Sequence, residues 1–444
     1  MDLTDYRKIF EDNLETLVNL LRIKSIYDEE SASDTAPFGK GVYEALLFMK
    51  DLALRDGFEV KEYDGNAISI SYGKGSKRID IASHLDVVEA DDDAFNIRIE
   101  DGKLIGRGTS DMKVPMFLTY LSLKMIREKY PDVNKEIRIV LGTDEERTMD
   151  DMKYYVSKAG YPDFAFTPDG TFPMGIGEKG AIMWTLSGEY SGVIEELDGG
   201  TQCNIVSPIA KAIIKDNNLS EVERYLKDNS MDGSVTLTDN KLVVTINGVA
   251  SHASRPHLGH SATIDLLRLI SDLYNDELCH NLYDTYHNYH GSGFDSFVSD
   301  DVMDCLSVNL GVLKISDGKL SGQVDCRYPM SENADTLTER LKKRSMVNVS
   351  LDYNDDPTLC DENDVYVRTL LENYREITGD YSRPVISGGV SYSKVFKHCV
   401  SYGPNVEGLP STAHQANEYV DIEDCYLWFR IYHEAIEKLV LLEV

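Results

Sequence analysis

Seven acidic and histidine side chains follow short apolar runs that are scattered over this chain of 444 residues. Such runs are typical of strands, and strand ends in an open α/β sheet converge on one crevice, so residues far apart in the sequence can meet there. Two histidines with three or four carboxylates can bind two divalent metal ions and leave one carboxylate to act as a base. Metal-assisted hydrolysis is therefore the chemistry indicated by His84, Asp86, Asp111, Glu145, Glu146, Asp169 and His414.

The histidine His84 ends an apolar run, and Asp86 follows it two residues later. Side chains at positions i and i+2 point the same way in an extended segment. The carboxylate of Asp86 can therefore hold the imidazole ring while one ring nitrogen of His84 binds a metal ion. A solvated polar strand end is the alternative interpretation, because motifs as short as His-x-Asp often match by chance.

Three consecutive acids, Asp144, Glu145 and Glu146, follow the apolar run 137–141. Crowding of carboxylates is unfavourable unless cations neutralise them. Neighbouring residues in a turn point in different directions, so one glutamate can bind a metal ion while the other takes a proton from water. A solvated acidic loop is the alternative, and it is common in so acidic a chain.

The remaining candidates have ordinary interpretations when each is taken alone. Asp111 follows a glycine-containing turn and can either cap the next helix or bridge two metal ions through its two oxygens. Asp169 ends a short apolar run and His414 lies in a polar turn. Each could be an ordinary polar residue of a solvated turn. His252 differs from the other histidines because it follows an alternating apolar run and a group of small residues.

The composition excludes several classes of protein. The chain has 45 basic and 76 acidic residues, a net charge of -31 that repels nucleic acid and anionic membranes. We find no secretory signal and no apolar run near the roughly 18 residues that a membrane-spanning helix needs. The seven cysteines are odd in number and lack Cys-x-x-Cys spacing, which indicates reduced thiols in a cytoplasmic protein.

Alternating helical and strand-like segments up to residue 167 predict an α/β fold with a mostly parallel sheet flanked by helices. Longer alternating strands then predict an inserted α+β lid domain. We expect a catalytic domain at 1–179 and 383–444 and a lid at 180–382, with Thr4 or Asp5 capping the first helix. The expected helices are 4–22, 42–57, 114–129, 207–215, 261–274, 334–343 and 422–442, and the expected strands are 58–63, 67–72, 78–83, 136–141, 164–167, 182–188, 234–237, 241–247, 305–315 and 319–327.

The order and context of these motifs resemble a family of di-zinc peptidases and deacylases. It includes carboxypeptidase G, aminoacylase, succinyl-diaminopimelate desuccinylase and carnosinase, and the dipeptidase V (Xaa-His dipeptidase-like) branch is the most similar. Together the matching segments are highly specific, although no single one is. They are 83–88, 106–111, 142–146, 167–169, 172–173, 178–180, 248–254, 387–389 and 413–419.

The resemblance implies a role for each matched residue. One metal ion takes His84, Asp111 and Asp169, and the other takes Asp111, Glu146 and His414. The resemblance further implies that Asp86 orients the first histidine, that Glu145 is the general base, and that His252 on the lid stabilises the oxyanion. The substrate's C-terminal carboxylate is then held by Asn204 and Arg327.

The implied activity is that of a cytoplasmic dipeptidase with two zinc ions, for which manganese or cobalt are alternatives. It hydrolyses short peptides with a free C-terminal carboxylate through a metal-bridging hydroxide and a glutamate base. We expect no nucleic-acid or membrane partner. The lid is larger than the family's simple single-module lid, so it can supply His252 to its own active site. We therefore expect a monomer, with a homodimer as the alternative.

Two other functions remain open at this stage. Deacylation of N-acyl amino acids also cleaves an amide beside a carboxylate, and the ligand set does not separate the two reactions. An inactive metal-binding relative is the other alternative, because segment 387–393 reads Ser-Gly-Gly-Val-Ser-Tyr-Ser where the branch commonly has Ser-Gly-Gly-Thr-Tyr-Ala-Arg. Segment 111–115 also differs from the common sequence of the branch, because it reads Asp-Met-Lys-Val-Pro in place of Asp-Asp-Lys-Gly-Pro. No metal ligand is lost.

Overall fold

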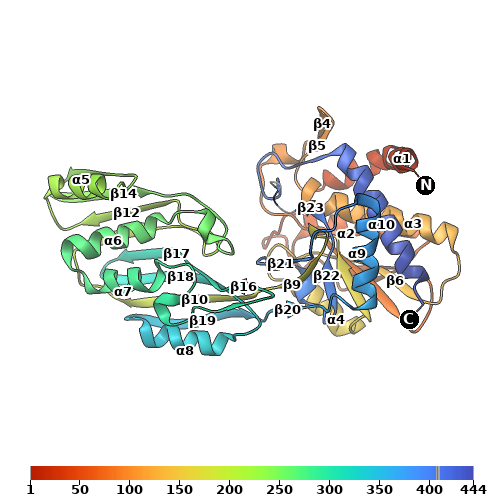
Figure 1. Cartoon of the computed structure of the whole chain (residues 1–444). Coiled ribbons are helices and arrows are strands. Elements are labelled where there is room, and N and C mark those ends of the chain that lie inside the picture. Colours follow the sequence, from red (N-terminus) through yellow and green to blue (C-terminus); the bar gives the residue numbers. More distant parts are fainter. Residues whose placement is uncertain (1, 407, 409–410, 444) are drawn as a thin grey trace. The chain divides into compact units, whose positions relative to one another are not determined.

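The computed structural model describes residues 2–406, 408 and 411–443, and they form two compact units. The first unit contains Met1–Gly177, Leu359–Val385 and Val390–Val444, and the second contains Glu178–Thr358 and Ile386–Gly389. The sequence analysis placed the lid at 180–382, whereas Leu359–Val385 belongs to the first unit and Ile386–Gly389 to the second. Each unit is described separately below (Figure 1).

The first unit is built on a mixed sheet with the strand order β1-β2-β6-β3-β7-β22-β9-β20, and β21 also pairs with β9. Its central strands β6, β3, β7 and β22 are parallel, whereas β1, β2 and β9 join antiparallel neighbours. This confirms the predicted α/β fold and adds antiparallel strands toward both edges. The strands are β1 (Glu59–Tyr63), β2 (Ala67–Tyr72), β3 (Arg78–His84), β6 (Glu136–Gly142), β7 (Phe164–Thr167), β9 (Gly175–Glu178), β20 (Thr358–Leu359), β21 (Val385–Ser387) and β22 (Cys399–Ser401).

Helices cover this sheet because its central strands are apolar on both faces, as in parallel sheets generally. In β3, for example, every residue from Ile79 to His84 is buried. Helix α4 packs beside β1 and β2, while α10 packs against α1, α3 and α9. The helices of this unit are α1 (Leu3–Leu21), α2 (Lys40–Arg55), α3 (Val114–Lys129), α4 (Asp150–Ala159), α9 (Val365–Thr378) and α10 (Ile422–Leu441).

The first helix begins earlier than the sequence analysis predicted. Asp2 is its N-cap, and the Asp2 carboxylate accepts hydrogen bonds from the backbone amides of Thr4 and Asp5. The side chain of Asp5 in turn accepts from the Asp2 amide at 3.0 Å, which completes a capping box. The prediction that Thr4 or Asp5 caps the helix is therefore wrong, because Asp5 serves as the third residue of the capping box.

The second unit is an antiparallel sheet in the order β13-β14-β12-β11-β17-β18-β10-β19. Figure 1 shows α6 and α7 lying against this sheet. Trp184 is fully buried in its core. Its elements are β10 (Gly180–Glu189), β11 (Ile194–Gly199), β12 (Ile209–Ile214), α5 (Leu219–Asp228), β13 (Gly233–Thr238), β14 (Lys241–Asn247), α6 (Ala262–Tyr274), α7 (Glu277–Tyr286), β17 (Ser307–Ser316), β18 (Lys319–Tyr328), α8 (Ala334–Arg344) and β19 (Asn348–Asp355).

One predicted helix is wrong. Segment 207–215 is rich in alanine and lysine, which favour helix, but it forms strand β12 between β11 and β14. Its buried residues Ala210, Ala212 and Ile214 alternate with exposed or half-buried ones, the period of a half-buried strand. Tertiary pairing therefore overrides the helical propensity of this segment.

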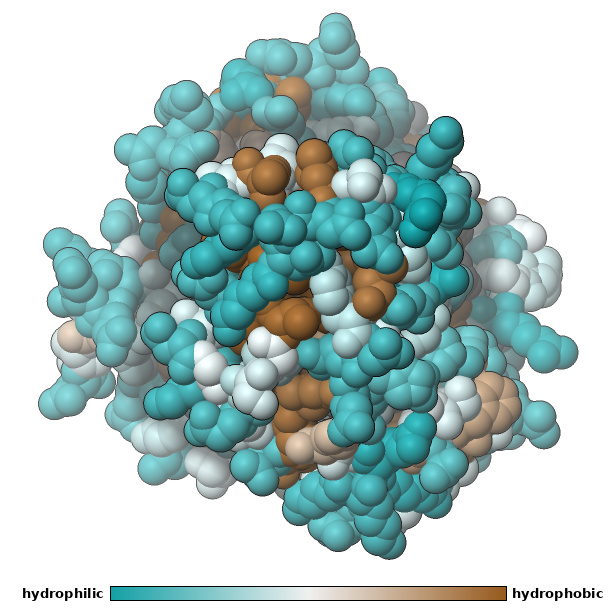
Figure 2. Space-filling view, turned by 90° about the vertical axis from the view of Figure 1, so that its left-hand side faces the viewer, coloured by the Kyte–Doolittle hydropathy of each residue, from teal (hydrophilic) through white to brown (hydrophobic). Residues whose placement is uncertain are grey.

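Hydrophilic side chains dominate the face of the molecule in Figure 2, where they surround small hydrophobic areas. The excess of acidic residues, 76 against 45 basic ones, contributes to this character. Within the described part of the chain, every helix is too short or too polar to cross a membrane.

Candidate metal centre

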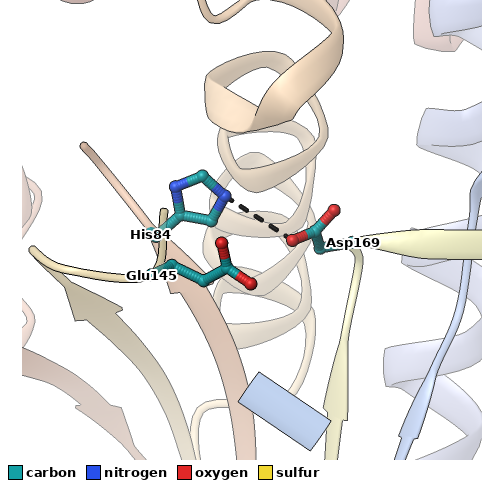
Figure 3. A group of neighbouring side chains, drawn as sticks. All are labelled: His84, Glu145 and Asp169. Atoms are coloured by element: carbon teal, nitrogen blue, oxygen red, sulfur yellow. Dashed lines mark ion pairs between the residues drawn. The ribbon is translucent and has the colours of Figure 1, made fainter. Parts of the chain in front are cut away.

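The candidate ligands come from the carboxyl ends of parallel strands in the first unit. His84 is the last residue of β3, Glu145 follows β6, and Asp169 follows β7. These strands are parallel neighbours, so their carboxyl ends lie at the same edge of the sheet. Figure 3 shows the imidazole and the two carboxylates directed toward one another. The sheet topology thus brings together residues that lie far apart in the sequence.

Around His84 the geometry suits one divalent cation. The Nε2 atom of His84 lies 3.1 Å from Oδ1 of Asp111 and 3.5 Å from Oδ2 of Asp169. Ligand-type atoms of His84, Asp169 and Glu145 all lie within 4.8 Å of one another. The other ring nitrogen, Nδ1, lies 2.9 Å from the backbone oxygen of Asp86. His84 is fully buried, and its Nε2 atom is directed at the carboxylates.

A second group of possible ligands shares Asp111 with the first. The Nε2 atom of His414 lies 3.0 Å from Oδ2 of Asp111 and 3.1 Å from Oε2 of Glu146. Asp111 therefore presents one oxygen to each histidine, which is the arrangement of a carboxylate that bridges two metal ions. Imidazole nitrogens and carboxylate oxygens are ligands that zinc accepts, so the residues present fit a pair of divalent cations.

The clustered carboxylates of the site also favour the binding of cations. Burial, together with neighbouring carboxylates, raises the pKa of Glu145, Glu146 and Asp169 above their ordinary values. Hydrogen bonds to Asp111 and Glu146 raise the pKa of His414 to about 10. Carboxylates at this spacing repel one another unless cations lie between them. Divalent cations at these positions would neutralise the cluster.

Asp86 connects the two groups of possible ligands. From the sequence, the Asp86 carboxylate was expected to hold the His84 ring, and its Oδ1 atom lies 3.5 Å from Nδ1 of His84. The nearer partner of that ring nitrogen is the Asp86 backbone oxygen, at 2.9 Å. The other carboxylate oxygen, Oδ2, accepts a hydrogen bond from the backbone amide of Glu146 at 3.0 Å. Asp86 thus links the strand that carries His84 to the loop that carries Glu146.

A second buried carboxylate, which sequence reasoning missed, holds the loop of Glu145 and Glu146. Asp151 accepts hydrogen bonds from the backbone amides of Thr143 and Asp144 and from the hydroxyl of Tyr392. Burial raises the pKa of Asp151 to about 7. The Tyr392 ring packs edge-on against His84, with 6.2 Å between the ring centroids. In the sequence Asp151 resembles an ordinary acid in the first turn of a helix, so its role carries no local signal.

The second unit brings its own candidate residues together. Arg327 forms a two-pronged ion pair with Asp325, at 2.8 and 2.7 Å, and its Nη1 donates to the backbone oxygen of Gly388 at 3.1 Å. The backbone oxygen of Asn204 accepts from the amide of Ala253 at 2.8 Å, next to His252. Ser254, which lies 2.8 Å from Nδ1 of His252, also approaches Gly388 so closely that no side chain fits there. A continuous set of contacts therefore joins the segments of Asn204, His252 and Arg327.

Comparisons with known proteins agree with this architecture. The model of a family described as peptidase family M20/M25/M40 matches residues 81–438. A Beta-Ala-Xaa dipeptidase from Lactobacillus delbrueckii subsp. lactis is 31% identical over 452 aligned residues, which cover 96% of this chain and 95% of that protein. Human carnosine dipeptidase 1 has the same fold, with a TM-score of 0.61, 15% identity and coverage of 99% and 98% of the two chains. Aminoacylhistidine dipeptidase from Vibrio alginolyticus has a TM-score of 0.56 at 14% identity, with coverage of 97% of each chain.

Gly142 provides a test of the contact between Asp151 and Tyr392. A Cβ atom at this position would overlap the Tyr392 hydroxyl and the Asp151 carboxylate. We expect Gly142→Ala to cost about 1–3 kcal/mol of stability, the usual range for overpacking. In a Tyr392→Phe background the same change should cost less, because the hydroxyl that it strikes is gone. Urea unfolding of the four proteins measures this coupling, and equal costs in both backgrounds would contradict the described packing.

Proposed function

The chain belongs to peptidase family M20/M25/M40 and is a metal-dependent peptidase, and from that premise we propose that it is a dipeptidase. Its substrates in this proposal are short peptides with a free C-terminal carboxylate. The observation that carries the proposal is the position of Asp111, whose two oxygens face His84 and His414 at 3.1 and 3.0 Å. The relative that is 31% identical is named as a dipeptidase, which supports the substrate class.

We assign two metal ions to the site, with zinc as the first choice and manganese or cobalt as alternatives that suit the same ligands. One ion is held by His84, Asp111 and Asp169, and the other by Asp111, Glu146 and His414. When bound, two divalent cations polarise the scissile carbonyl and lower the pKa of water toward neutrality. Asp86 fixes the His84 ring relative to the Glu146 loop through the contacts described above.

Glu145 is the general base in this proposal. Its carboxylate lies beside the His84 ring and the Asp169 carboxylate (Figure 3). Burial and the neighbouring acids raise its pKa, so it holds a proton more readily than an exposed glutamate does. Such a group can take a proton from the attacking water and deliver it to the leaving amine.

Arg327 and Asn204 are assigned to the substrate's C-terminal carboxylate, and His252 to the developing oxyanion. Arginine has five N–H donors, of which Asp325 takes two and Gly388 takes one. Two N–H groups, one on each terminal nitrogen, make no further hydrogen bond to the described residues, and they suit a bidentate contact with a carboxylate. The ion pair with Asp325 fixes the plane of the guanidinium before substrate arrives. A hydrogen bond from His252 that forms only in the transition state would raise kcat.

We further propose that the chain acts as a monomer that supplies His252 to its own active site. The cytoplasm is the proposed location, because an odd number of cysteines without Cys-x-x-Cys spacing fits a reducing compartment.

Replacement of Glu145 by glutamine tests its role as the base. We expect kcat to fall roughly 10²–10⁴-fold, the usual size of general-base effects, while the metal content measured by elemental analysis stays at the wild-type value. Glu136→Gln, at the other end of the preceding strand β6, is the matched control and should keep full activity. A Glu145→Gln enzyme with wild-type kcat would contradict the assignment.

A substrate panel tests the reaction class. We expect metal-loaded protein to hydrolyse dipeptides with a free C-terminus, and C-terminal amidation to lower kcat/KM by about 10–100-fold, because one charged hydrogen-bonded contact is lost. N-acetyl amino acids are the competing substrates. Faster turnover of these than of any dipeptide would make the protein a deacylase, and no turnover of any amide would make it an inactive metal-binding relative.

A further inference from the structure

Glu418 is a buried acid to which the sequence analysis assigned no role. We infer that Glu418 is a positioning residue that holds the bridging carboxylate of Asp111 and the imidazole of His414 at the separation the second metal ion needs. This inference rests on the metal ligands assigned under the proposed function. It concerns a residue that does not touch the metal ions or the substrate.

The carboxylate of Glu418 binds the turn that carries Asp111. Oε1 accepts hydrogen bonds from the backbone amides of Ser110 at 2.7 Å and Asp111 at 3.0 Å. Oε2 accepts from the amide of Gly108 at 3.1 Å and from Nη1 of Arg107 at 2.7 Å. The Glu418 side chain is only 1% exposed. An ionised carboxylate has about four acceptor sites. The four donors from residues 107–111 therefore fill all the acceptor sites of Glu418.

The turn needs such an acceptor because it is not a regular helix. Gly108 has a φ of 83°, and Asp111 and Met112 have non-helical backbone angles immediately before α3. Amides in such a turn lack the regular i→i−4 acceptors, and a buried amide without a partner is costly. Glu418 supplies the acceptor from a distant part of the chain. It thereby fixes the backbone from which the Asp111 side chain extends.

The segment of His414 is closed by contacts next to Glu418. The hydroxyl of Thr412 donates to the backbone oxygen of Tyr419 at 2.7 Å and accepts from the Tyr419 amide at 3.1 Å. This closes a loop that contains His414 and ends beside Glu418. Strand β24 (Tyr419–Asp421) then pairs with β5 (Lys103–Ile105), and the Gly106 amide donates to the Glu418 backbone oxygen at 2.8 Å. Through Glu418, the turn of Asp111 and the loop of His414 are held together.

The two metal positions depend on this link to different degrees. His84 is fully buried at the end of a central strand, and Asp169 lies two residues after the end of another, so the sheet positions both residues without Glu418. The side chain of His414 is 53% exposed and its backbone has a φ of 64°, a conformation that few residues other than glycine adopt. Little local packing holds this imidazole, so the second position should be the one that suffers when Glu418 is changed.

Cobalt titration of full-length Glu418→Gln, followed by visible absorption and calorimetry, tests the inference. We expect the second cobalt ion to bind 10–100-fold more weakly, the usual effect of changing a residue that orients a metal ligand. The first ion should lose less affinity, because His84 and Asp169 hold it together with Asp111. Dipeptide hydrolysis should fall at limiting cobalt and recover at excess cobalt, with KM unchanged. Two ions bound at wild-type affinity in this variant would overturn the inference.

A second variant separates the reach of Glu418 from its charge. Glu418→Asp keeps a carboxylate for Arg107 but shortens the side chain, so it cannot bind all three amides of the turn. We expect the same selective loss of the second ion, and wild-type affinity in this variant would also overturn the inference. Because the charge is retained, Glu418→Asp serves as the test if circular dichroism shows that Glu418→Gln does not fold.

Asp80→Asn is the control for a general loss of stability, because it removes a buried carboxylate that lies 3.2 Å from Arg78, near the end of β3 away from His84. This variant should bind two cobalt ions like the wild type, and weakening of the second ion to the level of Glu418→Gln would overturn the inference. Wild-type protein that binds fewer than two ions would instead refute the proposed metal centre.

Discussion

Mutual repulsion among half-buried carboxylates is the constraint on which the rest of this structure depends. Asp111, Glu145, Glu146 and Asp169 lie around two histidines at one edge of the first unit's sheet. Burial and the negative neighbours raise the pKa of Glu145, Glu146 and Asp169, so the ionised cluster is unstable by itself. Divalent cations resolve this conflict, and the chemistry proposed for the protein follows from their presence.

A cluster of this kind persists only if the backbone holds it firmly. Three buried carboxylates that we do not assign as ligands or base provide this support, each through backbone amides. Asp86 accepts from the amide of Glu146, Asp151 from the amides of Thr143 and Asp144, and Glu418 from the turn of Asp111. These carboxylates therefore fix the loops that follow β3 and β6 and the turn before α3. Substrate selectivity is assigned separately, to residues of the second unit.

The sequence was informative where local pattern and tertiary structure agree. The predicted helix 114–129 and the strands 164–167 and 241–247 have their observed bounds, because most apolar residues of these segments are buried. Segment 207–215 was predicted as a helix, yet pairing with two neighbouring strands decides its structure. The α/β class follows from the alternation of elements, whereas the antiparallel strands at the sheet edges depend on long-range pairing.

The candidate site could be predicted only in part, for a related reason. Acids and histidines that follow apolar runs are visible in a sequence, and they pointed to Asp111 and His414. The supporting residues Asp151, Tyr392 and Glu418 have no such signal, because their partners are backbone amides or buried groups up to 311 positions away. Their roles become visible only when the chain is folded.

A crystal structure of the zinc-loaded protein, with zinc located by its anomalous scattering, tests the central claim most directly. The account predicts two zinc ions about 3.5–4 Å apart, each about 2.0–2.2 Å from a different oxygen of Asp111. One ion should also bind His84 and the other His414. A single zinc ion, or two ions that do not share Asp111, would contradict the account.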